Sequence, residues 1–399
     1  MSEFPYDRLR RFPDVEAPNL QAHDATDLLL VERGCALAAD RGLTGSEIAV
    51  IGDEYGAITL ALADAGFHGV RVHQDLATGR RALVRNAAAL GLSRTPDADG
   101  VSTGDEAERA GSHPGSGTPF ASHELDAELL AGARLVLLQL PKALAELEEI
   151  ADAVARWAAD DVVLVAGGRV KHMTLAQNDV LARSFARVQA QRAERKSRLI
   201  VAEEPRDVPQ TPPFPVHATH AELGLTLAAH GGAFAGARID IGTRVLLEVL
   251  DRVPSEENVV DLGCGTGVLA AVYALTHPDA RVIATDRSAA AVASARATVA
   301  ANGLDERVEV THDDAGSELP DAGVDVVLLN PPFHLGASVH TAAATRLFEA
   351  AARLLKPGGE LWTVYNSSLS YKGELARRIG PTEQVRRTSK FTVTRSVRR

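Results

Sequence analysis

One pattern occurs twice in this chain, and it restricts the possible folds more than any other feature. Residues 48–66, "IAVIGDEYGAITLALADAG", have the form of an apolar strand, a glycine turn and a helix, and residues 258–276, "NVVDLGCGTGVLAAVYALT", have the same form. Downstream of each comes a strand that ends in an aspartate, Asp75 or Asp286, then an alanine-rich helix and another apolar strand. Strands that alternate with amphipathic helices favour a parallel, doubly wound sheet. Two such sets predict an α/β protein with two tandem Rossmann-like domains.

The length of the chain agrees with two domains. A chain of 399 residues is too long for one ordinary hydrophobic core, and its 45% apolar residues are enough to fill two. The proline-dense residues 204–216 predict a linker, which separates a first domain at residues 1–203 from a second at residues 217–399. Residues 95–123 are polar and rich in Gly, Ser and acidic side chains, which predicts a flexible insertion at the surface.

The two copies differ at the positions where chemistry would take place. An alignment of the two glycine turns places Val50 opposite Asp261 and Glu54 opposite Gly265. The first copy has therefore lost an acid and a turn glycine. We expect this degenerate N-terminal copy to be a scaffold or a docking surface rather than a second active site.

The remaining composition narrows the classes of function. Two cysteines provide neither a disulfide framework nor a metal cluster. The N-terminus has no apolar run suited to a signal peptide, and no segment approaches the ~18 uncharged apolar residues of a membrane span. We therefore expect a cytoplasmic protein that contacts no membrane and binds no metal. The net charge of −11 disfavours a nucleic-acid partner, but basic residues gather at 169–198 and 371–399. Such tracts form either local phosphate-binding surfaces or ordinary solvated faces.

The glycine turn of the second copy predicts a cofactor site. In open α/β sheets, ligands bind beyond the carboxyl ends of the strands. Gly263, Gly265 and Gly267 let the backbone turn tightly and approach a ligand there. The third glycine comes one residue too early for a dinucleotide fingerprint, and no lysine follows as in a phosphate-binding loop. Asp261 precedes the turn and can attract a cation, which favours S-adenosylmethionine with its ammonium and sulfonium groups.

Further carboxylates follow the next two strands. Asp286 ends the next strand and is placed to accept hydrogen bonds from both ribose hydroxyls. Asp314, or its neighbour Asp313, ends a third strand and could accept a hydrogen bond from the adenine amino group. A glycine turn alone is weak evidence, but these carboxylates at this spacing strengthen the prediction.

The stretch "VVLLNPPFHLG", residues 326–336, predicts the reaction centre. Its two prolines fix two φ angles and remove two backbone donors, so the strand must end there. The Asn330 side-chain oxygen and the Pro331 carbonyl can each accept one hydrogen of a planar, weakly nucleophilic amine, which aims its lone pair at a methyl donor. Phe333 offers a face on which a base can stack. His334 is as consistent with bracing the loop as with contacting the substrate.

With these motifs the chain resembles the tandem-domain ribosomal RNA guanine-N2 methyltransferases of bacteria, in which a degenerate N-terminal copy precedes an active class I methyltransferase domain. The motif "NPPFH" and residues 234–244, "FAGARIDIGTR", carry the resemblance. The large-subunit branch is favoured over its small-subunit relative by further segments of similarity: "NLQAHDATDLLL", "LPKALAELEEI", "KSRLI", "NSSLSYK" and "KFTV". The similarity covers nearly the whole chain outside the acidic insertion.

The resemblance implies methyl transfer from S-adenosylmethionine to the exocyclic N2 of a guanine in 23S ribosomal RNA. Separately, we expect the protein to be a monomer. The predicted catalytic residues are Asn330, Pro331, Pro332 and Phe333. The predicted cofactor-binding residues are Asp261, Gly263, Cys264, Gly265, Gly267, Asp286, Arg287, Asp313, Asp314, Asn330, Phe234 and Gly242. The predicted substrate-binding residues are Phe333, His334, Arg192, Arg195, Lys196 and Arg198.

Several alternatives stay open at this point. A guanine-N2 methyltransferase of 16S ribosomal RNA is the nearest, and adenine-N6 and glutamine-amide methyltransferases also act on a planar NH2 group. A different class would be an RNA-binding ribosome assembly factor that retains the pocket without using it. The intact Asp261, Asp286 and Asn330–Phe333 weigh against that class, because the same positions have drifted in the first copy.

Overall fold

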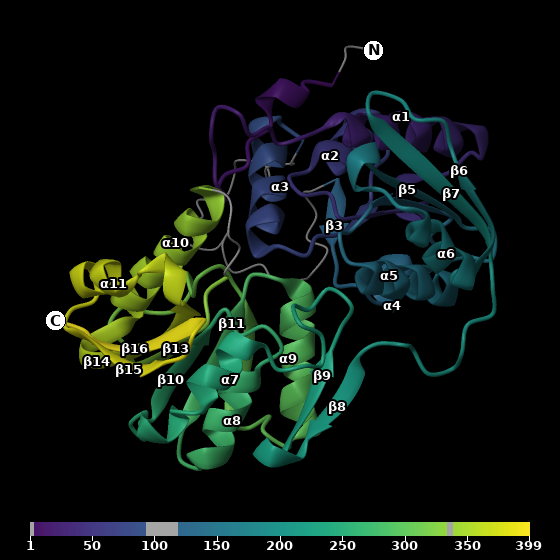
Figure 1. Cartoon of the computed structure of the whole chain (residues 1–399). Coiled ribbons are helices and arrows are strands. Elements are labelled where there is room, and N and C mark those ends of the chain that lie inside the picture. The colour runs from purple at the N-terminus through teal and green to yellow at the C-terminus, as the bar shows by residue number, and fades with distance from the viewer. Residues whose placement is uncertain (1–3, 93–118, 333–337) are drawn as a thin grey trace, which may run out of the picture. The chain divides into compact units, whose positions relative to one another are not determined.

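The computed structural model describes residues 4–92, 119–332 and 338–399, with side chains from residue 343 onward in the last range (Figure 1). The chain divides into two compact units, residues 1–213 and 214–399. Within the described ranges, each unit contains one seven-stranded sheet, and the second also has a two-stranded sheet. Most of the predicted acidic insertion, and both Phe333 and His334, lie outside the described residues.

The first unit has the sheet order β3-β2-β1-β4-β5-β7-β6. Its strands β1 to β5 are parallel to one another, whereas β7 is antiparallel to both β5 and β6. In chain order the helices and strands are α1 (Ala25–Asp40), β1 (Ile48–Ile51), α2 (Ala57–Asp64), β2 (Val70–His73), α3 (Ala77–Ala89), β3 (Phe120–Ser122), α4 (Ala127–Leu130), β4 (Leu135–Gln139), α5 (Leu144–Trp157), β5 (Val163–Arg169), α6 (Leu175–Ser184), β6 (Phe185–Ala190) and β7 (Ser197–Pro205).

The second unit has the order β12-β11-β10-β13-β14-β16-β15, which repeats the first strand for strand. Its elements are β8 (Val216–His220), β9 (Leu225–Ala229), α7 (Ile241–Leu247), β10 (Asn258–Leu262), α8 (Val268–Thr276), β11 (Arg281–Asp286), α9 (Ala289–Ala301), β12 (Val308–His312), β13 (Val324–Leu329), α10 (Ser338–Leu354), β14 (Leu355–Asn366), α11 (Lys372–Arg378), β15 (Thr382–Arg387) and β16 (Phe391–Val397). The extra hairpin β8–β9 packs along α9.

Both sheets are mixed rather than wholly parallel. The prediction of tandem doubly wound α/β domains is confirmed, but the last two strands at one edge of each sheet are antiparallel. These strands form hairpins, β6–β7 and β15–β16, and a short turn can join only antiparallel neighbours. A second interpretation of residues 196–200 from the sequence is the passage from the last helix to the last strand of the first sheet. In the structure these residues contain the hairpin turn at Lys196 and the start of β7.

Each sheet is covered by helices on both faces, which explains its long apolar strands. In the second unit one core contains Val259 and Leu269 and includes residues of α7, α8 and α9, while the other contains Val260 and Phe348 and includes residues of α10 and α11. Successive residues of β10 therefore point into opposite cores. This packing fixes the carboxyl end of β10, where the glycine turn begins. Among the described residues, no helix is both long enough and apolar enough to cross a membrane.

Candidate active site

The glycine turn between β10 and α8 has an open outer surface. Gly263 N donates a hydrogen bond to the carbonyl of Thr285 at 2.8 Å, and Gly265 N donates to Oδ2 of Asp286 at 2.9 Å. The two glycines have φ angles of +76° and +55°, in the region that glycine adopts without steric cost. A Cβ atom on either would meet no described atom within 4 Å. The backbone at this turn is thus accessible to a ligand.

Asp261, the last residue but one of β10, is a buried carboxylate with one oxygen unused. The residue is 1% exposed, and its Oδ2 accepts a hydrogen bond from Ala270 N at 2.9 Å. Its Oδ1 accepts no hydrogen bond from the described residues. The pKa of Asp261 is raised to about 7, chiefly by burial; the hydrogen bond from the Ala270 amide opposes this shift and the charge of Asp286 contributes to it. A cation beside Oδ1 would favour the ionised form of this acid.

Asp286 fixes the turn from the neighbouring strand. It ends β11 and accepts hydrogen bonds from Gly265 N through Oδ2 and from Ser288 N through Oδ1, both at 2.9 Å. A carboxylate oxygen can accept more than one hydrogen bond, so these contacts are compatible with ribose hydroxyls as additional donors. The adjacent Arg287 receives a hydrogen bond on its carbonyl from Nε2 of His312 at 2.9 Å. Cys264 and Gly267, also predicted to bind the cofactor, belong to the same turn.

Asp313 and Asp314 follow β12 at the same edge of the sheet. Asp313 is 1% exposed and accepts hydrogen bonds from Ser317 Oγ at 2.6 Å and Glu318 N at 2.9 Å, which organises its own loop. The Asp314 side chain forms an ion pair with Arg346 of α10. The structure therefore brings both acids to the predicted edge, but each already has partners within the protein.

Asn330 follows β13, the neighbour of β10, and its amide is held at one end only. Its Nδ2 donates a hydrogen bond to Thr243 Oγ1 at 2.8 Å and to Asp240 Oδ2 at 3.3 Å. Its Oδ1 is buried and has no hydrogen-bond partner among the described residues. A buried acceptor without a donor costs roughly 1–3 kcal/mol, and such groups are rare in folded proteins. Pro331 is buried and Pro332 is exposed.

The partners of Asn330 come from the start of α7. Asp240 is the N-cap of this helix, and its Oδ2 accepts hydrogen bonds from Gly242 N at 2.8 Å and Thr243 N at 3.3 Å. The motif "FAGARIDIGTR" indicated a place near the cofactor for Phe234 and Gly242. The structure places Gly242 in the first turn of α7, whereas Phe234 lies in the loop before it with 66% of its surface exposed. The contact of Thr243 with Asn330 was not predicted.

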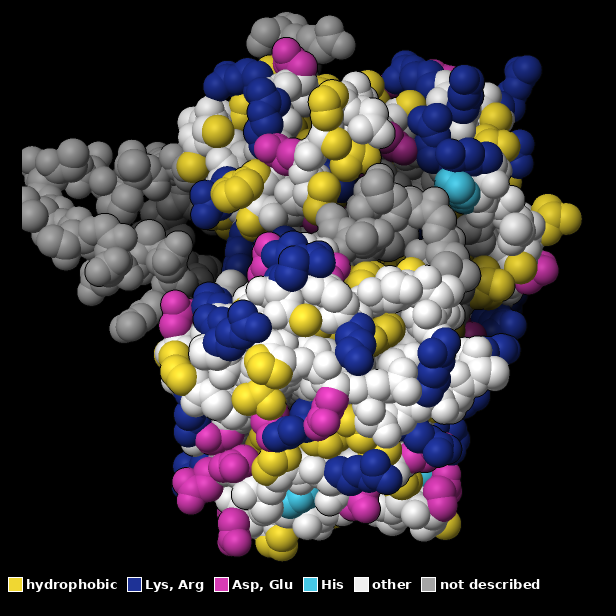
Figure 2. Space-filling model, turned by 60° about the vertical axis from the view of Figure 1, so that its left-hand side comes forward, with side chains coloured by type: hydrophobic (Ala, Val, Ile, Leu, Met, Phe, Trp, Pro, Cys, Tyr) yellow, Lys and Arg dark blue, Asp and Glu magenta, His cyan; other side chains and the backbone are white. Residues whose placement is uncertain are grey.

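The four predicted basic substrate-binding residues lie together on the β6–β7 hairpin of the first unit. Arg192, Arg195 and Lys196 are exposed, while Arg198 is half-buried. Arg195 forms ion pairs with Glu32 and Glu194, both at 3.3 Å. On the face shown in Figure 2, Lys and Arg side chains are interspersed with Asp and Glu side chains. The hairpin is therefore a local concentration of basic groups on a protein of mixed surface charge.

The polar groups at the corresponding turn of the first unit bond within the protein: buried Asp53 accepts hydrogen bonds from Gly56 N through Oδ1 and from Thr59 N through Oδ2. The registers of β1 with β2 and of β10 with β11 place Gln74, not Asp75, opposite Asp286. The correspondence between the two aspartates was therefore wrong by one residue. Gln74 is buried, and its Nε2 donates to the backbone carbonyl of Asp53 at 2.6 Å.

The space above the first glycine turn is also filled. A Cβ atom on Gly52 would lie 3.2 Å from the carbonyl of Gln139, whereas the corresponding Gly263 faces open space. The N-terminal segment packs on this turn, because the Tyr55 hydroxyl donates to Asp14 Oδ2 at 2.8 Å and the Arg11 guanidinium lies 4.5 Å from the centre of the Tyr55 ring. Among the described residues of the first copy, the N-terminal segment and the backbone of Gln139 therefore cover the glycine turn.

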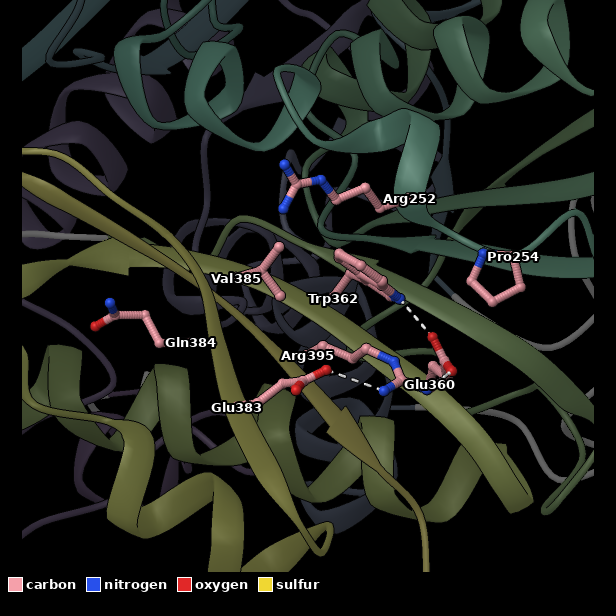
Figure 3. A pocket seen from close by; sticks show the side chains of 8 residues that line it. All are labelled: Arg252, Pro254, Glu360, Trp362, Glu383, Gln384, Val385 and Arg395. Atoms are coloured by element: carbon pink, nitrogen blue, oxygen red, sulfur yellow. Dashed lines mark hydrogen bonds and ion pairs between the residues drawn. The ribbon is translucent and has the colours of Figure 1, made fainter.

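A hollow of about 390 Å³ lies elsewhere in the second unit (Figure 3). Its charged groups pair with one another: Arg395 with Glu360 and, at 3.0 Å, with Glu383, while Trp362 Nε1 donates to Glu360 at 2.8 Å. The residues that line it are Arg252, Pro254, Glu360, Trp362, Glu383, Gln384, Val385 and Arg395. This lining includes no predicted cofactor residue. Across the described parts of the chain, no group of three or more His, Cys, Asp or Glu side chains is arranged to hold a metal ion.

Two family profiles match the chain. The one described as "RLMG N-terminal domain" matches residues 2–109 and 116–206, and the one described as "Methyltransferase small domain" matches residues 224–395. The two profiles thus meet near the boundary between the two units.

Curated relatives match along the whole chain. Ribosomal RNA large subunit methyltransferase G of Streptomyces avermitilis is 35% identical over 98% of this chain and 97% of its own length. The proteins of the same name from Streptomyces coelicolor and Pseudomonas aeruginosa are each 34% identical, over 98% and 96% of this chain and 97% and 96% of their own lengths. A solved structure of a 16S rRNA N2 methyltransferase, RsmC of T. thermophilus, in complex with AdoMet and guanosine, superposes with a TM-score of 0.67 over 88% of both chains. Its identity is 22%, so this likeness concerns the fold.

Proposed function

Because the chain belongs to the family of ribosomal RNA large subunit methyltransferase G, we propose that its second unit transfers a methyl group from S-adenosylmethionine to the exocyclic N2 of a guanine in 23S ribosomal RNA. The observation that carries this proposal is the Asn330 amide. Its nitrogen is held by Asp240 and Thr243, while its buried oxygen has no donor among the described residues. The exocyclic amine of a guanine supplies the missing donor.

The residues around the glycine turn fit S-adenosylmethionine. Gly263 and Gly265 leave room for a ligand against the backbone, and the unused Oδ1 of Asp261 suits a cationic group. Asp286 stands beside the turn as an acceptor for ribose hydroxyls. Asp313 and Asp314 lie after the next strand, on the side proposed for the adenine. When bound, S-adenosylmethionine supplies an electrophilic methyl group.

The protein contributes positioning and electrostatics rather than strong-base catalysis. The N2 lone pair of guanine is delocalised into the ring and is weakly nucleophilic. Asn330 Oδ1 and the Pro331 carbonyl each accept one N–H of this amine, which localises the lone pair on nitrogen and aims it at the methyl group. As the nitrogen is methylated it becomes positively charged. The same two oxygens stabilise that charge and accept the departing proton on its way to solvent.

The first unit has a supporting role in this proposal. We assign it scaffolding and RNA docking, with Arg192, Arg195, Lys196 and Arg198 of the β6–β7 hairpin as contacts to phosphates. The target guanine has to be unpaired or flipped out of its helix, because a duplex does not present a whole base to a pocket at a strand end. We place the reaction in the cytoplasm and assign it to a monomer.

Mass mapping of ribosomal RNA from cells with and without this protein tests the proposal. We expect one N2-methylguanine to disappear from 23S RNA in the deletion strain and to return with the wild-type gene but not with Asn330→Ala. Loss of N2-methylguanine from 16S RNA would redirect the activity to the small subunit, and loss of N6-methyladenine would change the substrate class. No change in either RNA would reject an RNA methyltransferase in favour of a protein-amide substrate or an assembly factor. The names of the relatives favour the large subunit.

A further inference from the structure

We propose that Asp240 and Thr243 are positioning residues that determine which way the Asn330 amide faces, and that Asp240 makes the choice. The inference rests on the proposed function, since it assigns these two side chains a role in presenting Asn330 Oδ1 to the amine. Neither residue touches the reacting atoms in this role. Each acts through Asn330.

The geometry joins two segments that are far apart in the sequence. Asn330 follows β13, and Thr243 lies in the first turn of α7, 87 residues earlier, with its Oγ1 2.8 Å from Asn330 Nδ2. Asp240 Oδ2 lies 3.3 Å from the same nitrogen and is itself fixed by the backbone amides of Gly242 and Thr243. Thr243 is 8% exposed. These contacts hold the amide at its nitrogen end.

The chemistry of the two partners is different. A hydroxyl both donates and accepts, so Thr243 alone could face either end of an amide. An ionised carboxylate only accepts, so Asp240 can face the NH2 end of Asn330 but would repel its oxygen. Asp240 therefore excludes the flipped amide. A flipped Asn330 would present NH2 to an amine that also needs an acceptor, and the lone pair of the amine would not be aligned.

The first unit contains the same connection, which shows that it is part of the repeated fold. Asp24 caps α1 as Asp240 caps α7, and its side chain accepts from Thr26 N at 2.6 Å. Three residues after this cap, Asp27 receives a hydrogen bond from Nε2 of Gln139, the residue opposite Asn330. In both units, therefore, the amide at the end of β4 or β13 contacts the first turn of the helix that comes before the first strand of the sheet, α1 or α7. The proposed use of this connection in catalysis belongs to the second.

Removal and rescue of one oxygen test the role of Asp240. Its Oδ2 accepts hydrogen bonds from Gly242 N and Thr243 N and also faces Asn330 Nδ2. Asp240→Ala removes this oxygen, and we expect kcat to fall on the order of tenfold or more, with the Kd for S-adenosylmethionine and the KM for RNA within about twofold of wild type. Asparagine is as good an N-cap as aspartate, so Asp240→Asn caps α7 with an oxygen at the same place, still offers an acceptor to Asn330 Nδ2, and should restore kcat.

Thr243 provides the second test and Asp24 the control. Thr243→Val removes the acceptor and should lower kcat, whereas Thr243→Ser keeps the hydroxyl and should restore it. Asp24→Ala makes the same chemical change as Asp240→Ala at the cap of α1 and should leave kcat at the wild-type value. All variants are assayed with 23S RNA transcribed in vitro and methyl-labelled S-adenosylmethionine, and their folding is checked by circular dichroism.

The outcomes separate this inference from the function on which it rests. A wild-type protein that methylates no guanine N2 would reject the proposed function. An active wild type with an unchanged kcat for Asp240→Ala, or an Asp240→Asn variant no faster than Asp240→Ala, would reject the positioning role alone. If Asp240→Ala does not fold, the Thr243→Val and Thr243→Ser pair decides, because equal rates for the two would reject the role as well.

Discussion

The two units have the same strand order, but they differ in what covers the turn after the first strand of each sheet. In the first unit the N-terminal segment packs on that turn through Tyr55 and Asp14, and the backbone of Gln139 lies against Gly52. In the second, Gly263 and Gly265 face open space. The shared topology brings the same positions together in both units. Whether they form a binding site depends on the few residues that fill or leave that space.

The polar groups show the same contrast. In the first unit, Gln139 donates to Asp27, and Gln74 donates to the Asp53 carbonyl. In the second, Asp261 and Asn330 each keep one buried oxygen without a donor among the described residues. Unsatisfied buried acceptors reduce stability, and a folded protein that keeps two of them at one sheet edge is consistent with a ligand that satisfies them.

The largest expected difference between the units concerns the two amides at the strand ends. Asn330→Ala should lower methyl transfer on the order of 10²-fold or more, the scale of losing one preorganised polar contact, with the affinity for S-adenosylmethionine nearly unchanged. Gln139→Ala, the matched change in the first unit, should leave the transfer rate at its wild-type value. Single-turnover transfer and calorimetric cofactor binding measure the two effects separately. A parallel loss of binding and rate for Asn330→Ala would indicate a structural role for the loop instead.

The next difference is in cofactor binding. We expect calorimetry to find one equivalent of S-adenosylmethionine per chain, because the first turn is covered and has Gln74 where the second has Asp286. Hydrogen bonds to a charged group contribute about 1.5–3 kcal/mol each, so Asp286→Ala should weaken binding on the order of 10- to 100-fold. Gln74→Ala should not change it.

A structural control is needed for the Asp286 variant. Asp286 also holds Gly265 N and Ser288 N, so Asp286→Asn, which keeps an acceptor oxygen, separates loss of the turn from loss of the ribose contact. Two equivalents per chain, or undiminished affinity in Asp286→Ala, would contradict the contrast between the units.

The sequence predicted those parts of the fold and of the candidate site that depend on local pattern. The glycine turn, the apolar strands and the proline motif after β13 are each a short continuous stretch of sequence. The conformation of each follows from the residue types within that stretch. The residue of the first unit that is equivalent to Asp286 was predicted one position too late. The prediction matched identical residue types, Asp75 and Asp286, whereas the equivalent position is fixed by the register of the hydrogen-bonded strands, which gives Gln74.

Contacts between distant segments could not be predicted in this way. Thr243 meets Asn330 across 87 residues, and Tyr55 meets Asp14 across 41, and neither contact leaves a periodic signal in the sequence. The lost residues therefore predicted a degenerate first copy, but they did not predict that its glycine turn is covered. The position of Asp27 opposite Thr243 could have indicated the shared connection, since each lies three residues after an aspartate at a helix start.

The two hairpins at the sheet edges provide a smaller test of how an acidic protein binds RNA. Replacing Arg192, Arg195, Lys196 and Arg198 on β6–β7 with alanine should weaken binding to 23S RNA fragments about tenfold, if the four cations together contribute roughly 1.4 kcal/mol, a small fraction of a kcal/mol each. Each lost phosphate contact should also flatten the log–log salt dependence by roughly 0.7 to 0.9. Filter-binding titrations measure both quantities.

The corresponding hairpin of the second unit provides the matched control. Arg387→Ala/Lys390→Ala changes exposed cations on and beside β15–β16. Unchanged affinity and slope in the β6–β7 variant, together with losses in the β15–β16 variant, would move the RNA-binding surface to the C-terminal tail.

The smallest expected effect is the pH dependence of cofactor binding, which should come from Asp261, a buried acid whose Oδ1 accepts no hydrogen bond from the described residues. Burial raises the pKa of Asp261 to about 7 in the ligand-free protein. A bound cation favours the ionised carboxylate and therefore lowers its pKa in the complex. Below pH 7 binding has to displace a proton, so affinity for S-adenosylmethionine should fall as the pH falls. Between pH 8 and pH 6.5 the Kd should rise roughly fourfold, from the change in the ionised fraction of an acid with this pKa.

The variant Asp261→Asn isolates this contribution. It has the same shape and no titrating group, so it should bind more weakly at pH 8 and show no rise in Kd that depends on position 261. The amino group of S-adenosylmethionine also titrates in this range, but it does so equally with both proteins, so the difference between their slopes belongs to Asp261. Calorimetry of both proteins in two buffers of different ionisation enthalpy should detect proton release on binding below pH 7 for wild type only. Two outcomes would show that the unused oxygen of Asp261 does not face the cationic part of the cofactor. One is the same dependence of Kd on pH in wild type and Asp261→Asn, and the other is tighter binding by wild type at pH 6.5 than at pH 8.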